Sequence, residues 1–154
     1  MNSNCDRWKK TCSTLESLSW LPPLLARITL AVVFVESGWG KLQAIPKVVG
    51  FFTSLGIPIP EFMAYLVAFS EFGCGLLILF GLVTRLAAIP LVITMIVAIL
   101  TAKKDDLHSF SDLTGFTEYL YIILLIWLIV KGAGLISADE FISRRCEKTS
   151  NVPS

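Results

Sequence analysis

The sequence has few charged residues and carries no recognisable metal or cofactor motif. Asp, Glu, Lys and Arg make up 16% of its 154 residues, whereas soluble domains average about 25%. The single histidine, His108, lies in a polar segment, where it is more simply a solvated loop residue than a metal ligand. Because no HxxH, ExxH or CxxC spacing occurs, the sequence argues against a zinc site, a di-metal carboxylate bundle and a bound iron–sulfur cluster.

Charge and cysteine usage exclude further classes of protein. The net charge is only +1, so nothing indicates a nucleic-acid partner. Residues 1–20 are polar and show no short apolar core with a cleavage site, so we expect the first apolar segment itself to direct the chain to the membrane. Three of the four cysteines, Cys5, Cys12 and Cys146, lie near the polar ends and are predicted to be ordinary free thiols.

Apolar residues, by contrast, are abundant and form four long runs. They account for 55% of the chain, and the mean hydropathy is +0.72. Each run has about the length that a helix needs to cross the roughly 30 Å hydrocarbon core of a bilayer. We predict an all-α protein, an integral membrane four-helix bundle, with a domain of residues 21–141 between polar tails, 1–20 and 142–154. The four predicted spans are residues 21–39, 61–83, 86–102 and 114–131.

The connections between these spans differ in length and polarity. Only Thr84 and Arg85 separate the second and third spans, which predicts a tight antiparallel hairpin. Residues 43–60 are apolar but interrupted by proline and glycine, and Pro46 suits the start of a short helix in the outer membrane interface. This segment is either a cap over the bundle or a gate for a ligand. Residues 103–115 are predicted to form a polar outer loop.

Lysine and arginine are shared unequally between the two sides of the predicted bundle. Four spans place both termini and the turn between spans two and three on one side of the membrane. That side carries nine cations, Arg7, Lys9, Lys10, Arg27, Arg85, Lys131, Arg144, Arg145 and Lys148. The other side carries four, Lys41, Lys47, Lys103 and Lys104. By the positive-inside rule, both termini are predicted to be cytoplasmic.

Three carboxylates lie within or beside the apolar runs. Glu71 is the most informative, because it lies about 15 Å from the nearer end of the second span. An acid at that depth needs a partner, a proton or a water-filled pocket, so Glu71 is a functional candidate. The simpler alternative is a hydrogen bond that fixes helix packing. Glu36 and Glu118 lie nearer the outer ends of their spans, where contact with water, or for Glu36 with Lys41, explains them equally well.

Small residues accompany two of these acids. Glu71, Cys74 and Gly75 share one helix face, and so do Glu36 and Gly40. Small side chains permit close helix contact, and they also leave room for a ligand. Cys74 is predicted to be an apolar filler rather than a redox thiol, since nothing in the sequence indicates a lowered thiol pKa.

Taken in order, these segments resemble the DoxX family of four-helix membrane proteins. The most specific parts are the G-x-G-K-L of the first span, the E-x-x-x-G and G-x-x-T-R of the second, and the G-A-G-x-x-S-x-D that follows the fourth. The resemblance implies a four-helix bundle in a bacterial inner membrane. It also implies a link to redox chemistry, because the family name is tied to a thiosulfate:quinone oxidoreductase and relatives are described as membrane partners of oxidoreductases.

The resemblance and the three acids together define the candidate positions. The ligand-binding candidates are Gly38, Gly40, Lys41, Glu71, Cys74, Gly75 and Glu118. The structural signature positions are Gly81, Arg85, Gly132, Gly134, Ser137 and Asp139. Glu36 departs from the family pattern, in which we expect a histidine or a neutral residue before the glycines, so no family role passes to it.

Two functions fit these observations. In the first, the chain is a membrane subunit of a redox system and binds a quinone or similar molecule between the first, second and fourth spans. Glu71 then holds or relays a proton, Lys41 orients a carbonyl or anion, and a partner supplies the electrons. In the second, the chain is a non-catalytic scaffold or assembly factor for a partner oxidoreductase. A solute transporter is less favoured, because no inverted repeat or broken helix is evident.

Overall fold

The computed structural model describes residues 20–104, 110–132, 134 and 137. Within these residues all regular structure is helical, as the sequence predicts. The helices are α2 (Leu21–Gln43), α3 (Ile45–Ser54), α4 (Pro60–Phe80), α5 (Thr84–Ala102), α6 (Phe110–Gly115) and α7 (Thr117–Lys131). Both predicted tails, His108, Asp139 and three of the cysteines, Cys5, Cys12 and Cys146, lie outside the described residues.

Three of these helices, α2, α4 and α5, are long and apolar enough to cross a membrane. Their outward faces carry large apolar side chains, which suits contact with lipid because a helix satisfies its own backbone hydrogen bonds. Helix α7 is equally apolar but has 15 residues, a length of about 22 Å. That is shorter than the roughly 30 Å hydrocarbon core, so its assignment as a fourth span stays a prediction.

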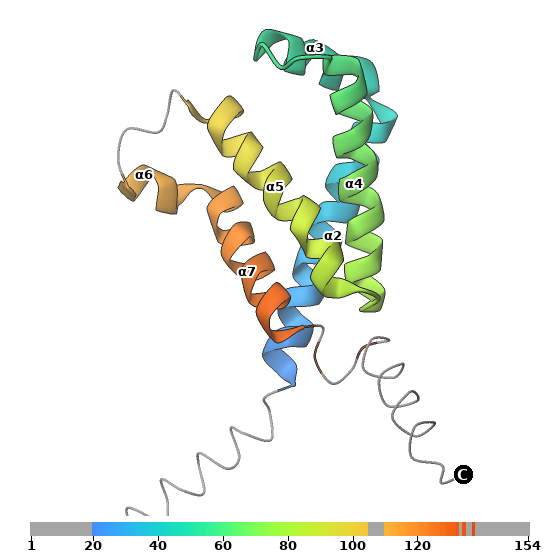
Figure 1. Cartoon of the computed structure of the whole chain (residues 1–154), viewed down its shortest axis with the longest axis vertical. Helices are drawn as coiled ribbons and strands as arrows, with labels where there is room; N and C mark the ends of the chain where they lie inside the picture. The colour runs from blue at the N-terminus through green and yellow to red at the C-terminus, as the bar shows by residue number, and fades with distance from the viewer. Residues whose placement is uncertain (1–19, 105–109, 133, 135–136, 138–154) are drawn as a thin grey trace, which may run out of the picture.

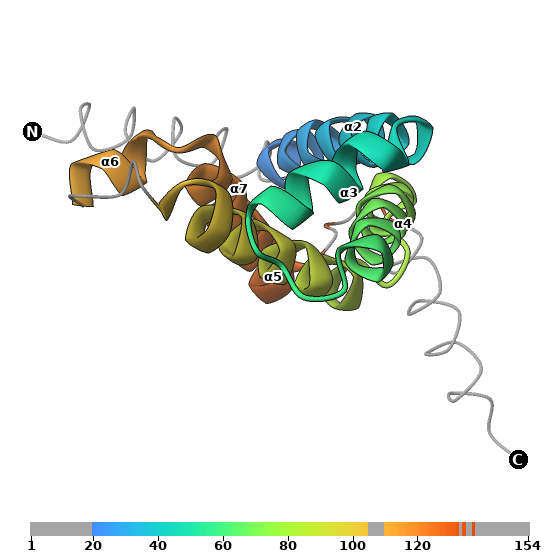
Figure 2. The ribbon, with the colours of Figure 1, turned by 90° about the horizontal axis from the view of Figure 1, so that it is seen from above.

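The four longer helices form a bundle that α3 covers at one end (Figure 1). Helix α2 packs most extensively on α4, and α5 on α7. The start of α2, the turn between α4 and α5, and the end of α7 lie together at the opposite end from α3 (Figure 1). Seen from above, α3 crosses over the space between α2 and α5 before the chain returns to α4 (Figure 2). This arrangement separates the bundle into a turn end and an α3 end.

The hairpin between α4 and α5 differs from the sequence prediction by one turn. Helix α4 ends at Phe80, residues 81–83 form the connection, and Thr84 and Arg85 belong to the first turn of α5. Gly81 has a φ of 67° and its N–H donates to the carbonyl of Ile78, so it terminates α4 in the left-handed conformation that glycine adopts without strain. The apolar residues after Phe80 obscured this ending in the sequence.

The two connections of residues 43–60 and 103–115 contain two short helices, of which the sequence predicts only the first. The short helix predicted from Pro46 is confirmed as α3, which begins one residue earlier at Ile45. Residues 103–115, predicted to be a polar loop, include the short helix α6. The position of α3 in the membrane interface stays a prediction.

The hydrophobic core lies in the turn half of the bundle. It consists mainly of Leu30, Ala31 and Phe34 of α2, Ile78 of α4, Ala87, Ala88 and Leu91 of α5, and Leu125 and Leu128 of α7. Small residues on α5 let the helices approach closely there. Toward the α3 end, α5 and α7 diverge from α4 (Figure 1), which leaves space for the cavity described below.

Most signature glycines hold the ends of the helices together. A Cβ atom at Gly81 would lie 2.8 Å from the Nη1 atom of Arg27 and 2.8 Å from the Cβ of Ser137. A Cβ at Gly134 would lie 3.1 Å from Pro23 at the start of α2. These positions therefore serve packing at the turn end, away from the candidate site.

Candidate functional site

Three polar side chains meet where α2 and α4 pack together. Lys41 of α2 forms an ion pair with the Oε2 atom of Glu71 of α4. Ser37 lies one turn before Lys41, and its hydroxyl donates a 2.9 Å hydrogen bond to the same oxygen of Glu71. The Lys41 ammonium also donates to the Ser37 oxygen at 2.8 Å. We call these three residues the Glu71 cluster.

Glycines on both helices allow this cluster to form. A Cβ atom at Gly38 would lie 2.8 Å from the Cα of Phe72 and closer still to its backbone nitrogen. A Cβ at Gly75 would lie 3.0 Å from the backbone nitrogen of Val35. Because both glycines face the opposite backbone, α2 and α4 approach closely enough for Glu71 to reach the polar residues of α2.

The burial of Glu71 makes its pairing with Lys41 essential. Only 1% of the Glu71 side chain is exposed, and an unpaired charge at that position would be very unfavourable. Lys41 is 28% exposed and lies in the last turn of α2, so its stem crosses apolar surface while its ammonium reaches the acid. The pair is neutral overall, which is why it persists inside the bundle.

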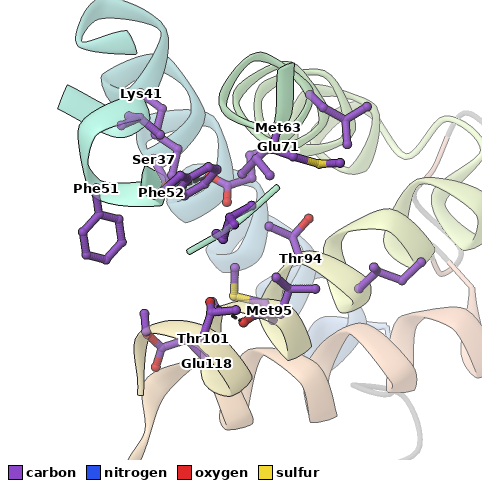
Figure 3. Close-up of a pocket in the computed structure, with 18 of the residues that line it drawn as sticks. Ser37, Lys41, Phe51, Phe52, Met63, Glu71, Thr94, Met95, Thr101 and Glu118 are labelled. Atoms are coloured by element: carbon purple, nitrogen blue, oxygen red, sulfur yellow. Dashed lines mark hydrogen bonds and ion pairs between the residues drawn. The ribbon is translucent and has the colours of Figure 1, made fainter. Parts of the chain in front are cut away.

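The Glu71 cluster lines a cavity of about 760 Å³ in the α3 half of the bundle. Apolar side chains form most of its wall, including Phe52 of α3 and, at the edge, Phe51 (Figure 3). Phe34 and Tyr121 border its inner end, with ring centroids 6.0 Å apart. The cavity is therefore mostly apolar, with the Glu71 cluster on one wall.

A second, smaller group of polar side chains lies across the cavity. Thr94 and Thr101 of α5 and Glu118 of α7 face it from the side opposite the Glu71 cluster (Figure 3). Glu118 lies 3.9 Å from the ammonium of Lys103, which also lies over the ring of Phe116. In the described part of the chain, no three His, Cys, Asp or Glu side chains are grouped so as to hold a metal ion.

The structure divides the predicted ligand-binding residues into two sets. Lys41, Glu71 and Glu118 line the cavity. Gly38 and Gly75 lie instead in the α2–α4 contact, and Cys74 is partly buried against the hydrophobic core. Gly40 is exposed, and a Cβ atom added there would meet no neighbouring helix within 4 Å.

Glu36 points away from this site. Its side chain is exposed on the outer face of α2 and does not border the cavity. Lys41, which the sequence offered as a partner for Glu36, is paired with Glu71 instead.

Several cavity residues were not recognised from the sequence. Ser37 precedes Lys41 by four residues, so the same helical spacing that linked Glu71 to Gly75 also predicts that Ser37 and Lys41 share a face. The cavity was expected between the first, second and fourth spans, but α5 and α3 line it as well. Their apolar residues gave no signal, because side chains that face a cavity have the same composition as those that face lipid.

The geometry of the cluster suits hydrogen bonding and proton transfer rather than nucleophilic attack. Ser37 lies inside α2, where the neighbouring N–H groups take part in helical hydrogen bonds and do not form an oxyanion hole. The Lys41 ammonium has three donors, two of which serve Ser37 and Glu71. Lys41 thus offers a donor to a ligand, and Glu71 offers a proton acceptor.

Fold and site together define a multi-pass helical membrane protein with a buried ion pair in the wall of a mostly apolar cavity. The DoxX family model matches residues 23–104, and the chain belongs to the DoxX family. The matched region contains all of α3, α4 and α5 and almost all of α2, and therefore the whole Glu71 cluster.

Known relatives cover most of the chain. It is 34% identical to "Putative oxidoreductase CatD" of Bacillus subtilis over 131 residues, 84% of this chain and 92% of that protein. It is 34% identical to "Uncharacterized membrane protein Rv3486" of Mycobacterium tuberculosis, over 80% of this chain and 84% of that protein. It is 30% identical to "Inner membrane protein YqjF" of Escherichia coli, over 79% of this chain and 92% of that protein.

The apolar helices and these relatives agree on location. The chain is a multi-pass protein of the bacterial inner membrane, in contact with the lipid bilayer. No solved structure matches the chain.

Proposed function

We propose that this protein is the membrane subunit of a redox system and binds a quinone, or a similar small carbonyl compound, in the cavity beneath α3. The observation that carries this proposal is the placement of the buried Lys41–Glu71 pair in the wall of a mostly apolar cavity. A cavity of about 760 Å³ lies within the usual range of small-molecule sites, which runs from about 300 to 1,000 Å³.

Each member of the Glu71 cluster has a distinct part in this proposal. Lys41 donates a hydrogen bond to a quinone carbonyl, and its charge favours the partial negative charge that grows there on reduction. Glu71 accepts the proton of a quinol hydroxyl on oxidation, or returns it on reduction. Ser37 is hydrogen-bonded to both Lys41 and Glu71, and it fixes the position of one side chain relative to the other. The apolar walls fit the face of the ring.

The electrons come, in this proposal, from a partner oxidoreductase. The reduction of a quinone to a quinol takes two electrons and two protons. Glu71 passes these protons one at a time and is reprotonated between the two transfers, and the cluster supplies no electrons. The relative in Bacillus subtilis that is named as an oxidoreductase supports a redox setting for this chain. We expect the partner to dock on the side that carries the basic termini. The positive-inside rule predicts that this side is cytoplasmic.

The direct experiment is extraction in mild detergent followed by mass spectrometry of the bound small molecules. The wild-type protein is expected to retain a quinone-like compound at close to one per chain, and Glu71→Gln to lose it. Glu36→Gln is the matched control, because it makes the same change at an exposed acid on α2 outside the cavity.

Two results would count against this function. If Glu71→Gln and Glu36→Gln retain the same amount of ligand as the wild type, the cluster does not bind it. If the wild type retains a stoichiometric protein and no small molecule, the alternative of a non-catalytic scaffold is favoured, and the Glu71 cluster only fixes helix packing.

A further inference from the structure

We infer that the cavity opens sideways between α4 and α5 into the bilayer, and that its ligand is a membrane-dissolved amphiphile with a polar ring and a long apolar tail. This inference rests on the proposed function, because it adds the source and the tail of the ligand to the same site. It follows from where the two helices separate, from which side chains border the opening, and from the depth of that opening.

Helices α4 and α5 are close at one end and apart at the other. At the turn end, residues 81–83 join them, and Ile78 and Ala88 lie together in the hydrophobic core. Toward α3 the two helices diverge (Figure 1). The cavity-lining residues of α4 and α5, among them Leu66 and Val97, lie in these diverging halves. The cavity is thus a wedge between the two helices.

The side chains at the front of this wedge border both the cavity and the outer surface. Leu66 of α4 is 51% exposed, and Ile93 and Val97 of α5 are 56% and 44% exposed, although all three line the cavity. On the α2 wall, by contrast, Phe34 is buried and Ser37 is only partly exposed. Exposed lining residues mark an opening, and Leu66, Ile93 and Val97 mark one between α4 and α5. Phe51 of α3, which is 52% exposed, and the exposed Lys47 and Thr117 mark a further part of the rim at the α3 end.

The opening lies beside the hydrocarbon core rather than beside water. Ile93 is equidistant from Thr84 and Ala102, the two ends of α5, and Leu66 lies about 9 Å along α4 from its first residue. A helix of this kind crosses a core of roughly 30 Å, so the middle of α5 lies near the bilayer midplane. The three side chains at the opening are all apolar.

At the α3 end, apolar side chains partly cover the cavity. Phe52 of α3 and Leu55 and Ile57 of the following segment line the cavity from above. Viewed from that side, α3 and the returning chain cross over the space between α2 and α5 (Figure 2). A water-soluble ligand would have to pass beneath this apolar cover and lose its hydration, which is unfavourable.

The position of the polar groups fixes the orientation of the ligand. The Glu71 cluster lies on the α2–α4 wall, whereas the apolar opening lies between α4 and α5. A ring that reaches Lys41 leaves its substituents directed toward Ile93 and Val97. An apolar tail on that ring passes out through the opening and stays in lipid. Binding therefore removes only the head group from the bilayer.

The test compares two ligands that share a benzoquinone head group, one with a decyl tail and one without a tail. Their binding to the full-length protein in lipid nanodiscs is measured for the wild type, Ile93→Trp and Ile96→Trp. The Ile93→Trp variant enlarges a side chain at the opening. Ile96→Trp is the matched control, because Ile96 is also exposed on α5 but does not line the cavity.

For each ligand the ratio of variant to wild-type affinity is compared, which cancels the different partitioning of the two ligands into lipid. Ile93→Trp is expected to weaken binding of the tailed ligand by about tenfold or more, and to leave the tailless ligand within about threefold of the wild type. Ile96→Trp is expected to change neither.

Equal effects of Ile93→Trp and Ile96→Trp on the tailed ligand would overturn the inference. The same conclusion follows if Ile93→Trp weakens both ligands by the same factor. If the wild type binds both ligands and Glu71→Gln abolishes that binding, but the Trp variants show either of these patterns, the lateral opening is wrong while the proposed function stands. If the wild type binds neither ligand, the proposed function fails as well.

Discussion

Helix α4 packs against α2 and α5 in different ways, and the contrast between these two contacts explains the site. Against α2 it packs through Gly38 and Gly75, so closely that a Cβ atom at either position would meet the opposite backbone. Against α5 it is held only at the turn end, and large apolar side chains such as Leu66 surround a cavity elsewhere. The close contact brings the ion pair together, and the open one gives a ligand access to it.

This contrast shows that one buried acid serves both interfaces. Glu71 faces α2, where Lys41 and Ser37 neutralise and orient it, and it also lines the cavity. The close α2–α4 contact therefore positions the site, and the divergence of α5 exposes it to a ligand. The following predictions weaken one side of the contrast while leaving the other intact, in order of decreasing effect.

Removal of the cation should have the largest effect on stability. Lys41→Met leaves Glu71 buried without its partner, and loss of one member of a buried pair typically costs about 3–5 kcal/mol. The double variant Lys41→Met/Glu71→Leu should be more stable than Lys41→Met alone, because it removes the buried charge. Reversible unfolding in mixed detergent micelles measures both. If the double variant is no more stable than Lys41→Met alone, the two side chains are not coupled.

A methyl group in the α2–α4 contact should have the next largest effect. Gly38→Ala places a Cβ atom against the backbone of Phe72, and overpacking of this kind typically costs about 1–3 kcal/mol. Gly40→Ala is the control, since its added Cβ would meet no neighbouring helix within 4 Å. Each variant is heated, and the fraction of protein that remains monodisperse is measured as a function of temperature. Equal loss in both would mean that α2 and α4 are not in close contact.

Loss of the serine hydroxyl should have a moderate effect. Ser37→Ala removes the 2.9 Å hydrogen bond to Glu71, and one hydrogen bond typically contributes about 1 kcal/mol. Quinone binding should weaken by a similar amount, because Lys41 and Glu71 lose their common partner. Ser70→Ala is the matched control. The Ser70 hydroxyl donates its described hydrogen bond to the Val67 carbonyl of its own helix. The same affinity loss in both variants would contradict a role for Ser37.

Neutralisation of Glu118 should have the smallest effect on stability. It is paired with Lys103 at 3.9 Å and both side chains are partly exposed, and such pairs contribute less than about 1 kcal/mol. Glu118→Gln should therefore unfold nearly like the wild type. A large loss of stability in the same unfolding assay would show that the far wall of the cavity is as tightly organised as the Glu71 cluster.

The helical fold and the importance of Glu71 could be predicted from the sequence for physical reasons. Long apolar runs can only be helices in a bilayer, since each backbone polar group needs a partner within its own segment. An acid in the middle of such a run must be paired, and Lys41 and Glu71 are indeed paired. The end of α4 was misplaced because the apolar residues that follow Gly81 continue the hydrophobic pattern beyond the helix.

The cavity itself could not be predicted from the sequence. It exists because α4 and α5 diverge from a tight turn, and no local motif in the sequence specifies the angle between them. Residues that line it, such as Ile93, have the same apolar character as residues that face lipid. Gly38 and Gly75 were predicted as ligand candidates, but small residues serve close packing and open space equally well before the neighbouring helix is placed.

The most direct measurement of the central claim is photoaffinity labelling with an azido-substituted quinone, with the labelled residues mapped by mass spectrometry. The account predicts labels on cavity residues of facing helices, Val67 of α4 and Met95 of α5, and their loss in Glu71→Gln. Labels confined to the outward face of α4, at Phe62 and Phe69, or labels on the cavity that persist unchanged in Glu71→Gln, would contradict it.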